Sequence, residues 1–364
     1  MTLILIVILV ALVFEYINGF HDTANSIATV VSTKVLSPRQ AVMLAAVFNL
    51  LGALWGTAVA KTIASGIVDT QIVSSEVLVC ALLGAIVWNL LTWWFGLPSS
   101  SSHALVGGLC GAALAAAHNK WSVIVWSVPG KAHWWEGKGV LWKVLVPMVT
   151  SPVCGFLIGW LLMGLLYFLL RNWRPMTVSR VFGKAQLFSA AYMGFSHGTN
   201  DAQKTMGIIA LALAAATGAG TFDHLPAWLD FLRITPPEAG KSLDIKLWIK
   251  VTCALTMCAG TAAGGWRIIK TLGHKMVRLY PVHGFAAETT SATVLSVAAM
   301  LGMPVSTTHA ITTSIMGVGC AKGWNHLRLN VVERIVWAWL LTIPASGIVA
   351  YLCVRLAQVV GWIS

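Results

Sequence analysis

The sequence predicts an all-α protein that passes through a membrane many times. Of its 364 residues, 57% are hydrophobic and only 10% are charged, whereas soluble domains carry about a quarter charged residues. The mean hydropathy is +0.79. The apolar runs are too long for the strands of a membrane barrel and lack alternation, so helices are expected.

Ten hydrophobic segments are expected to lie in the membrane. The longer ones reach the roughly 20 residues that span about 30 Å of hydrocarbon. The fourth and ninth are about half as long, so they are expected to cross or re-enter as half-helices. The segments are 2–33, 40–60, 76–97, 104–117, 144–170, 186–215, 247–266, 284–301, 305–320 and 335–360.

The first segment is expected to be a transmembrane helix rather than a cleaved signal. It has no basic beginning and runs through Glu15 into a polar motif instead of a small-residue cleavage site. Two longer polar stretches, 118–143 and 216–246, are expected to be loops.

The chain contains the same pair of motifs twice, in the same order. "GFHDTAN" aligns with "GTNDAQK", which places Asp22 over Asp201, and "LPSSSSHALVGG" aligns with "MPVSTTHAITTS". Each half holds an odd number of segments, so the second half is expected to be inverted relative to the first. We expect a first repeat over 1–170, a cytoplasmic connection over 171–185 and a second repeat over 186–364.

The formal net charge of +12 indicates membrane topology rather than nucleic-acid binding. The Lys and Arg residues are spread over the loops, and such residues concentrate on the cytoplasmic side. With both termini extracytoplasmic, the loops at 34–39, 171–185, 267–283 and 321–334 face the cytoplasm. The expected location is the inner membrane of a bacterial-type cell, in contact with the lipid bilayer; a homo-oligomer stays open.

Besides Glu15, the carboxylates of Asp22, Asp201 and Glu288 interrupt the apolar segments. A charge at mid-membrane costs several kcal/mol, so each is expected to hold a coupling ion. Neighbouring glycines are expected to open the helices, because backbone carbonyls and a carboxylate together bind cations. The alternative is a structural ion pair or a hydrogen bond between helices. The glycines are Gly19, Gly194 and Gly198.

Hydroxyl side chains follow Pro98 and Pro304, and the pattern predicts two helix N-termini with proline in the first turn. Free amides and the positive dipole end of a helix attract anions. The alternative is capping and packing between helices. Lys204 stands where the first copy has Asn25, so it is expected to neutralise an aspartate or touch the anion. The hydroxyl residues expected to bind substrate are Ser100, Ser101, Ser102, Ser306, Thr307 and Thr308.

Catalytic residues, metal-ligand spacings and cofactor motifs are not recognisable in the sequence, so an enzyme is not expected. A membrane-embedded phosphotransferase would need a nucleophile–base pair or a metal cluster. The seven cysteines include no CxxC pair and are expected to be small core residues.

The motifs "GFHDTANSIAT", "FSHGTNDAQKTMGI", "LPSSSSHALVGG" and "MPVSTTHAITTS" resemble the signatures of the inorganic phosphate transporter (PiT) family. The resemblance covers nearly the whole chain and is closest to low-affinity bacterial phosphate permeases. It implies secondary transport of inorganic phosphate, driven by a cation gradient and without a cofactor. It points to Asp22 and Asn25 in the first copy and to Asn200 and Asp201 in the second.

Two departures bear on the coupling ion. Many members of the family carry Asn where this chain has His21, and some carry Asn where it has Lys204. The His-Asp form resembles proton-coupled members that carry metal-phosphate, whereas sodium-coupled members share the scaffold. The coupling cation is therefore H⁺ or Na⁺. A sulfate permease is the alternative within the class, and an anion channel is a more distant one, since it would not need the two aspartates.

Overall fold

The computed structural model describes residues 1–69, 72–130, 133, 136–235, 243–323 and 327–363. Within these ranges the regular elements are helices, together with two isolated β-bridges. The predicted all-α class is confirmed, and each of the ten hydrophobic segments falls in helix.

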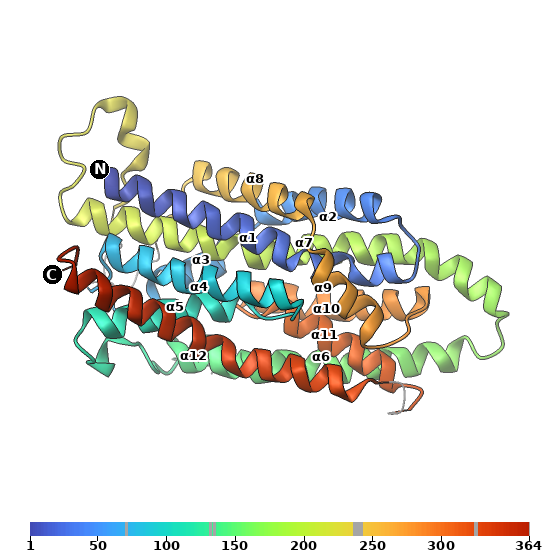
Figure 1. Cartoon of the computed structure of the whole chain (residues 1–364). Coiled ribbons are helices and arrows are strands. Elements are labelled where there is room, and N and C mark those ends of the chain that lie inside the picture. The colour runs from blue at the N-terminus through green and yellow to red at the C-terminus, as the bar shows by residue number, and fades with distance from the viewer. Residues whose placement is uncertain (70–71, 131–132, 134–135, 236–242, 324–326, 364) are drawn as a thin grey trace.

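The helices follow one another along an elongated bundle (Figure 1). Their bounds are α1 (Thr2–Ser32), α2 (Pro38–Ala53), α3 (Ala58–Ser65), α4 (Ser75–Phe95), α5 (Ser101–Ala116), α6 (Val146–Leu169), α7 (Pro175–Gly218), α8 (Leu247–Ala263), α9 (Trp266–Lys270), α10 (Pro281–Met300), α11 (Thr307–Cys320) and α12 (Leu329–Val359). Shorter helical turns lie at Trp121–Val123, Leu141–Leu145, Ala227–Leu232 and Thr271–Lys275.

All four loops expected to be cytoplasmic are partly helical. Helix α2 begins at Pro38, α7 at Pro175 and α12 at Leu329, and α9 with the following turn covers 266–275. Helices α8 and α9 form one bent unit with an angle of 58°, and α2 and α3 form another with an angle of 70°. Glycines with positive φ separate the members of each pair, Gly264 (φ 74°) and Gly56 (φ 81°), a conformation that glycine adopts readily.

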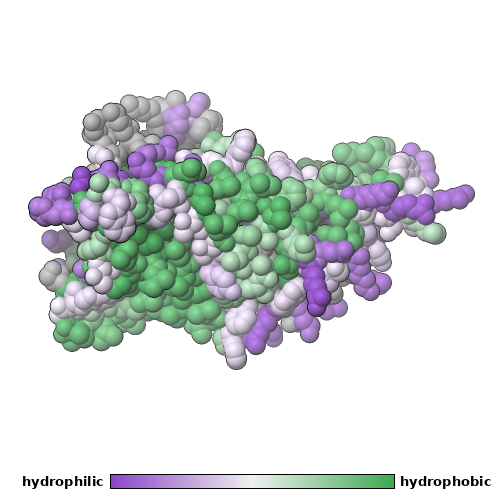
Figure 2. Space-filling model, turned by 90° about the horizontal axis from the view of Figure 1, so that it is seen from above, coloured by the Kyte–Doolittle hydropathy of each residue, from purple (hydrophilic) through white to green (hydrophobic). Residues whose placement is uncertain are grey.

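In the described residues, four helices are long and apolar enough to cross a membrane, or up to six elements if each bent pair is one span. Hydrophobic residues cover the middle of the face seen in Figure 2, and hydrophilic residues gather toward its two ends. This distribution fits a molecule whose long axis crosses a bilayer.

The two half-length segments are arms of helical hairpins. Helices α4 and α5 join through residues 96–100, and α10 and α11 join through residues 301–306. The first hairpin enters from the end that carries both termini, and the second enters from the opposite end (Figure 1). Their tips meet inside the bundle, where the Ser102 hydroxyl donates to the Val305 carbonyl at 3.0 Å. Both hairpins therefore turn back inside the bundle.

The same order of elements occurs in both halves: a long helix, a bent pair, a hairpin and another long helix. Helix α1 thus corresponds to α7, and α6 to α12. Outside its hairpin, each half contains two long helices and one bent pair, which makes three elements that run along the bundle. An odd number of crossings reverses the second half, as expected for an inverted repeat.

The predicted helix openings are wrong. Helices α1 and α7 run without interruption through Asp22 and Asp201. The glycines instead allow neighbouring helices to approach closely. A Cβ at Gly19 would lie 2.6 Å from the Met257 carbonyl oxygen, and one at Gly198 would lie 2.2 Å from that of Asn49. Gly194 packs against Phe48 and Ala45 in the same way. Small residues serve this purpose between membrane helices.

Cysteines introduced at Ser179 and Thr221 are expected to react with an impermeant reagent from opposite sides of the membrane. Both residues are exposed. Ser179 lies near the start of α7 and Thr221 just beyond its end, and the 44 residues of this helix extend about 66 Å. The measurement is labelling of intact cells and of inverted vesicles, in a variant from which the native cysteines have been removed. Labelling of both positions from one side would contradict the inverted repeat.

Candidate functional site

The two hairpin tips are built alike. The Ser100 hydroxyl accepts a hydrogen bond from the backbone N–H of His103 at 3.2 Å. The Ser306 hydroxyl accepts one from the backbone N–H of His309 at 3.1 Å. Both serines are therefore N-caps. The prolines lie two residues before these caps, not in the first turn as predicted, because the chain is still non-helical there. The first amides of α5 and α11 have no acceptor within their helices.

Asp22 is buried beside the first of these tips. Its Oδ2 accepts a hydrogen bond from the Ser101 hydroxyl at 2.7 Å. Its Oδ1 lies 2.6 Å from Nδ1 of His21, whose Nε2 lies 3.2 Å from the Thr92 hydroxyl. The first carboxylate is thus bonded to the first residue of helix α5.

Asp201 repeats this arrangement at the second tip. Its Oδ2 accepts a hydrogen bond from the Thr307 hydroxyl at 3.1 Å and lies 3.1 Å from Nε2 of His197. Its Oδ1 pairs with the ammonium of Lys204. Lys204 is fully buried, so in this structure it neutralises one aspartate, which is one of the two roles expected for it.

The two halves meet at these carboxylates. Ligand atoms of Asp22, His197 and Asp201 all lie within 4.8 Å of one another. The Asn25 amide donates to the hydroxyls of Thr307 (3.1 Å) and Thr308 (2.9 Å), so it joins α1 of the first half to α11 of the second. One buried polar centre therefore receives side chains from both repeats.

Most predicted site residues lie at this centre, but some of their side chains hold the hairpin tips together and do not contact the carboxylates. Ser100 and Ser306 cap their helices, and Ser102 joins the two tips through the Val305 carbonyl. The Asn200 amide lies 3.4 Å from the Met303 carbonyl, and its Oδ1 has no partner among the described residues.

Glu288 lies apart from the two aspartates. It is fully buried and accepts hydrogen bonds from Thr29 (2.5 Å), Gln186 (3.0 Å) and Ser189 (2.5 Å). Thr29 follows Asp22 by seven residues, about 10 Å along the helix. In the described part of the chain no cation pairs with this carboxylate. Glu288 therefore forms a second polar cluster, closer to the end opposite the termini.

Several residues of these clusters were missed in the sequence. His197 precedes Asp201 by four positions, and that spacing places two side chains on one helix face, so the pattern could have revealed it. Gln186 and Ser189 come from another segment than Glu288, and no local pattern connects them. The same holds for Thr205, which donates to the buried Glu15 carboxylate.

The chemistry of this centre favours a cation and an anion together. Two carboxylates and an imidazole converge, and such groups bind protons or metal ions. The amide-bearing N-termini of α5 and α11 meet at the same place, and helix N-termini bind anions.

Comparison with known proteins agrees with this chemistry. The model of the phosphate transporter family matches residues 18–350. A protein of Rhizobium meliloti named "Probable low-affinity inorganic phosphate transporter" is 43% identical over 354 residues, 97% of this chain and 96% of the relative. A Bacillus subtilis protein of the same name is 40% identical, covering 96% of both chains.

A Mycobacterium tuberculosis protein, also of that name, is 42% identical over 99% of this chain and 78% of its own length. A solved structure titled "The sodium-dependent phosphate transporter" shares the fold, with a TM-score of 0.79 and 24% identity over 99% of this chain and all of the other. These relatives are transporters, not enzymes. The match over most of its length shows that this membrane protein belongs to the phosphate transporter family.

Proposed function

We propose that this protein imports inorganic phosphate by symport with a cation. The observation that carries the proposal is the convergence of Asp22, Asp201 and His197 within 4.8 Å at the N-termini of two half-helices. An anion is repelled by nearby carboxylates at low dielectric. Lys204 offsets only one of the two carboxylates, so phosphate can lie there only when a cation neutralises the remaining negative charge.

The proposed phosphate position lies between the tips of the two hairpins. The free amides at the start of α5 and α11, and the hydroxyls of Ser101, Thr307 and Thr308, supply donors to an oxyanion. Asn25 and Asn200 add amide groups, and Asn200 keeps an unpartnered Oδ1. Lys204 is the charged donor. Once Asp201 is neutral, the Lys204 ammonium would leave that carboxyl group and bind phosphate instead.

The ligands at the aspartates favour H⁺ over Na⁺ as the coupling ion. Nitrogen atoms of His21, His197 and Lys204 lie beside the two carboxylates. Hard cations prefer oxygen ligands, whereas carboxylate–imidazole pairs exchange protons readily. Glu288, bonded to neutral donors alone, is proposed as a further proton-carrying group along the same path.

A divalent metal-phosphate complex is a second candidate cargo, and the same cluster favours it. Two carboxylates and one imidazole form a ligand set for a divalent metal such as Mn²⁺ or Zn²⁺. Bound phosphate would complete the coordination and lower the net charge of the cargo. In this case the metal is part of the substrate.

We propose that residues 1–170 and 186–364 are the two repeats, which rock around this centre. The protein lies in the inner membrane of the cell. Its termini face outward, and 171–185 faces the cytoplasm. The excess of Lys and Arg in the loops expected to be cytoplasmic supports this orientation.

The test is uptake of labelled phosphate into proteoliposomes under an imposed gradient. Accumulation is expected with a pH gradient and without Na⁺. Mn²⁺ or Zn²⁺ should be transported with phosphate only if the complex is the cargo, which a labelled metal would reveal. Accumulation that needs Na⁺ would contradict proton coupling. Uptake of sulfate in preference to phosphate would identify the sulfate permease instead.

A further inference from the structure

A second cavity lies far from the aspartates, at the end of the bundle where α1 finishes. Its volume is about 720 Å³, and the residues that line it include Lys34, Arg278 and Arg328. Among the described residues that line this cavity none is acidic. In the described part of the chain, these three cations form no ion pair. No carboxylate of the described residues therefore compensates their positive charge.

The three cations come from separate elements. Lys34 follows α1, Arg278 precedes α10, and Arg328 is the residue before α12. Lys34 has a φ of 60°, a left-handed backbone conformation that residues other than glycine rarely adopt. A general excess of cytoplasmic Lys and Arg explains basic loops, but it does not require three of them to converge on one cavity.

A chain of hydrogen bonds connects this cavity to the Glu288 cluster. Thr33 lines the cavity and donates to Gln186 at 2.8 Å, which donates to Glu288 at 3.0 Å. Thr29 donates to the same carboxylate. Asp22, Asn25, Thr29 and Thr33 share one face of α1, since their spacing is three or four residues.

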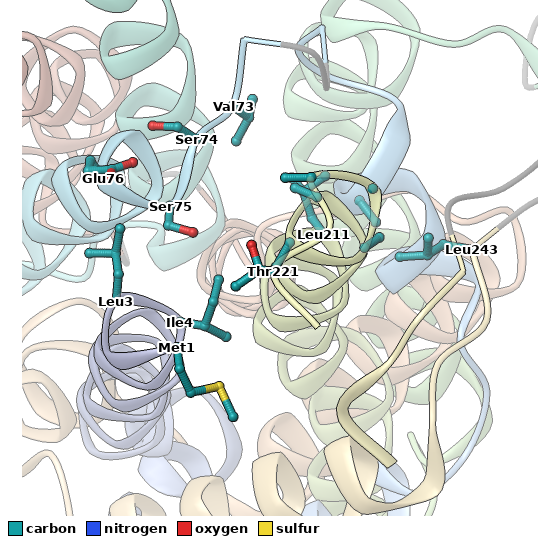
Figure 3. Close-up of a pocket in the computed structure, with 16 residues that line it drawn as sticks. Met1, Leu3, Ile4, Val73, Ser74, Ser75, Glu76, Leu211, Thr221 and Leu243 are labelled. Carbon is teal, nitrogen blue, oxygen red and sulfur yellow. The ribbon is translucent and has the colours of Figure 1, made fainter. Parts of the chain in front are cut away.

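The cavity at the other end of the bundle has different chemistry. It has a volume of about 950 Å³ and lies where α1 and α4 begin and α7 ends (Figure 3). Its polar side chains include those of Ser74, Ser75, Glu76 and Thr221, and no described Lys or Arg lines it. Of these two cavities, only the one lined by Lys34, Arg278 and Arg328 offers an anion a cluster of cations.

We propose that the cavity of Lys34, Arg278 and Arg328 is a second, weak binding site for inorganic phosphate. It rests on the proposed function and deepens it. Phosphate released from the aspartate centre would pass the Glu288 cluster and pause among the three cations before it leaves. When transport runs in the reverse direction, the three cations would raise the local concentration of phosphate at this end of the bundle and not at the other.

The test compares the two faces of the membrane. In Lys34→Gln/Arg278→Gln/Arg328→Gln, the KM for phosphate should rise about tenfold at the face that carries Ser179, as expected for loss of electrostatic concentration. The KM at the opposite face should not change. Intact cells and inverted vesicles measure the two faces. The matched control removes three exposed cations near the start of α7, which line no part of this cavity: Arg174→Gln/Arg180→Gln/Lys184→Gln.

The proposal would be overturned if the KM of the triple variant equalled that of the wild type at both faces, or rose by the same factor at both faces. The same rise in the control variant would also overturn it. A direct binding measurement makes the result independent of transport. The weak, salt-sensitive component of inorganic phosphate binding, seen as phosphorus NMR line broadening, should be present in the wild type and lost in the triple variant, while any binding at the hairpin tips persists. This holds even if the chain proves not to be a symporter.

Neutral phosphatidylcholine nanodiscs, with and without phosphatidylglycerol, distinguish the free ion from a lipid headgroup. Phosphate binding in the neutral discs supports the proposal. A weak, salt-sensitive binding component that the triple variant retains, or an effect of the triple variant seen only with phosphatidylglycerol, would overturn it.

Discussion

Asp22→Asn is expected to abolish the accumulation of phosphate against a gradient while the protein still inserts normally. The amide keeps the shape of the side chain and its hydrogen bond from Ser101, but it neither binds a proton nor contributes a charge to a metal ion. Uncoupled exchange of phosphate can persist, because the hairpin tips are unchanged. We expect concentrative uptake to fall by up to about 100-fold, because coupling between two ligands is typically about 1–3 kcal/mol.

Asp201→Asn should have the same effect, but it needs a different control. Lys204 pairs with this carboxylate and is fully buried. The single substitution leaves an uncompensated buried charge, which costs about 3–5 kcal/mol and is expected to reduce folding. Asp201→Asn/Lys204→Gln removes both charges, so its expression should recover while its accumulation stays lost.

The measurement is labelled phosphate retained at steady state, with protein level checked by immunoblot. Glu76→Gln is the matched control, since it removes a carboxylate from the cavity at the other end of α4. If the aspartate variants concentrate phosphate like the wild type, with the same ion dependence, their carboxylates are structural.

The doubled motif carried most of the predictable information about the fold. Two copies with the same order imply related structures. The alignment alone therefore pairs Asp22 with Asp201, and the Ser101 hydroxyl with that of Thr307. The half-length segments followed from the thickness of a bilayer. Whether these segments cross or re-enter depends on where their tips find partners, which is a tertiary question.

The remaining features depend on packing between distant segments. Glycine beside an aspartate can open a helix or let another helix approach, and only the contact of Gly198 with the Asn49 carbonyl decides between them. The sequence groups Glu288 with the aspartates as a coupling-ion residue because it interrupts an otherwise uncharged segment. Its partners Gln186 and Ser189 lie about a hundred positions away, beyond any local pattern.

Removal of the hydroxyls at the two hairpin tips is the second prediction with a large effect. Ser101→Ala and Thr307→Val each delete one donor to an aspartate and one hydroxyl from the proposed phosphate position. A hydrogen bond to a charged group contributes about 1.5–3 kcal/mol. Each single variant should therefore weaken phosphate binding by roughly tenfold or more, and the double variant should weaken it further.

The structure supplies a matched control on helix α11. The Thr313 hydroxyl donates to the His309 carbonyl of its own helix at 2.8 Å, so Thr313→Val deletes a hydroxyl without touching the tip. Ser100 and Ser306 are unsuitable as controls, because they cap their helices and their loss would destabilise the hairpins.

The KM for phosphate and its dependence on the coupling ion separate two explanations. A hydroxyl that binds phosphate raises the KM when removed, at every concentration of the coupling ion. A hydroxyl that only orients its aspartate instead shifts the concentration of H⁺ or metal at which transport is half-maximal, and saturating that ion restores the KM. An unchanged KM in both Ser101→Ala and Thr307→Val would place phosphate elsewhere, because these are the hydroxyls that each tip directs at an aspartate.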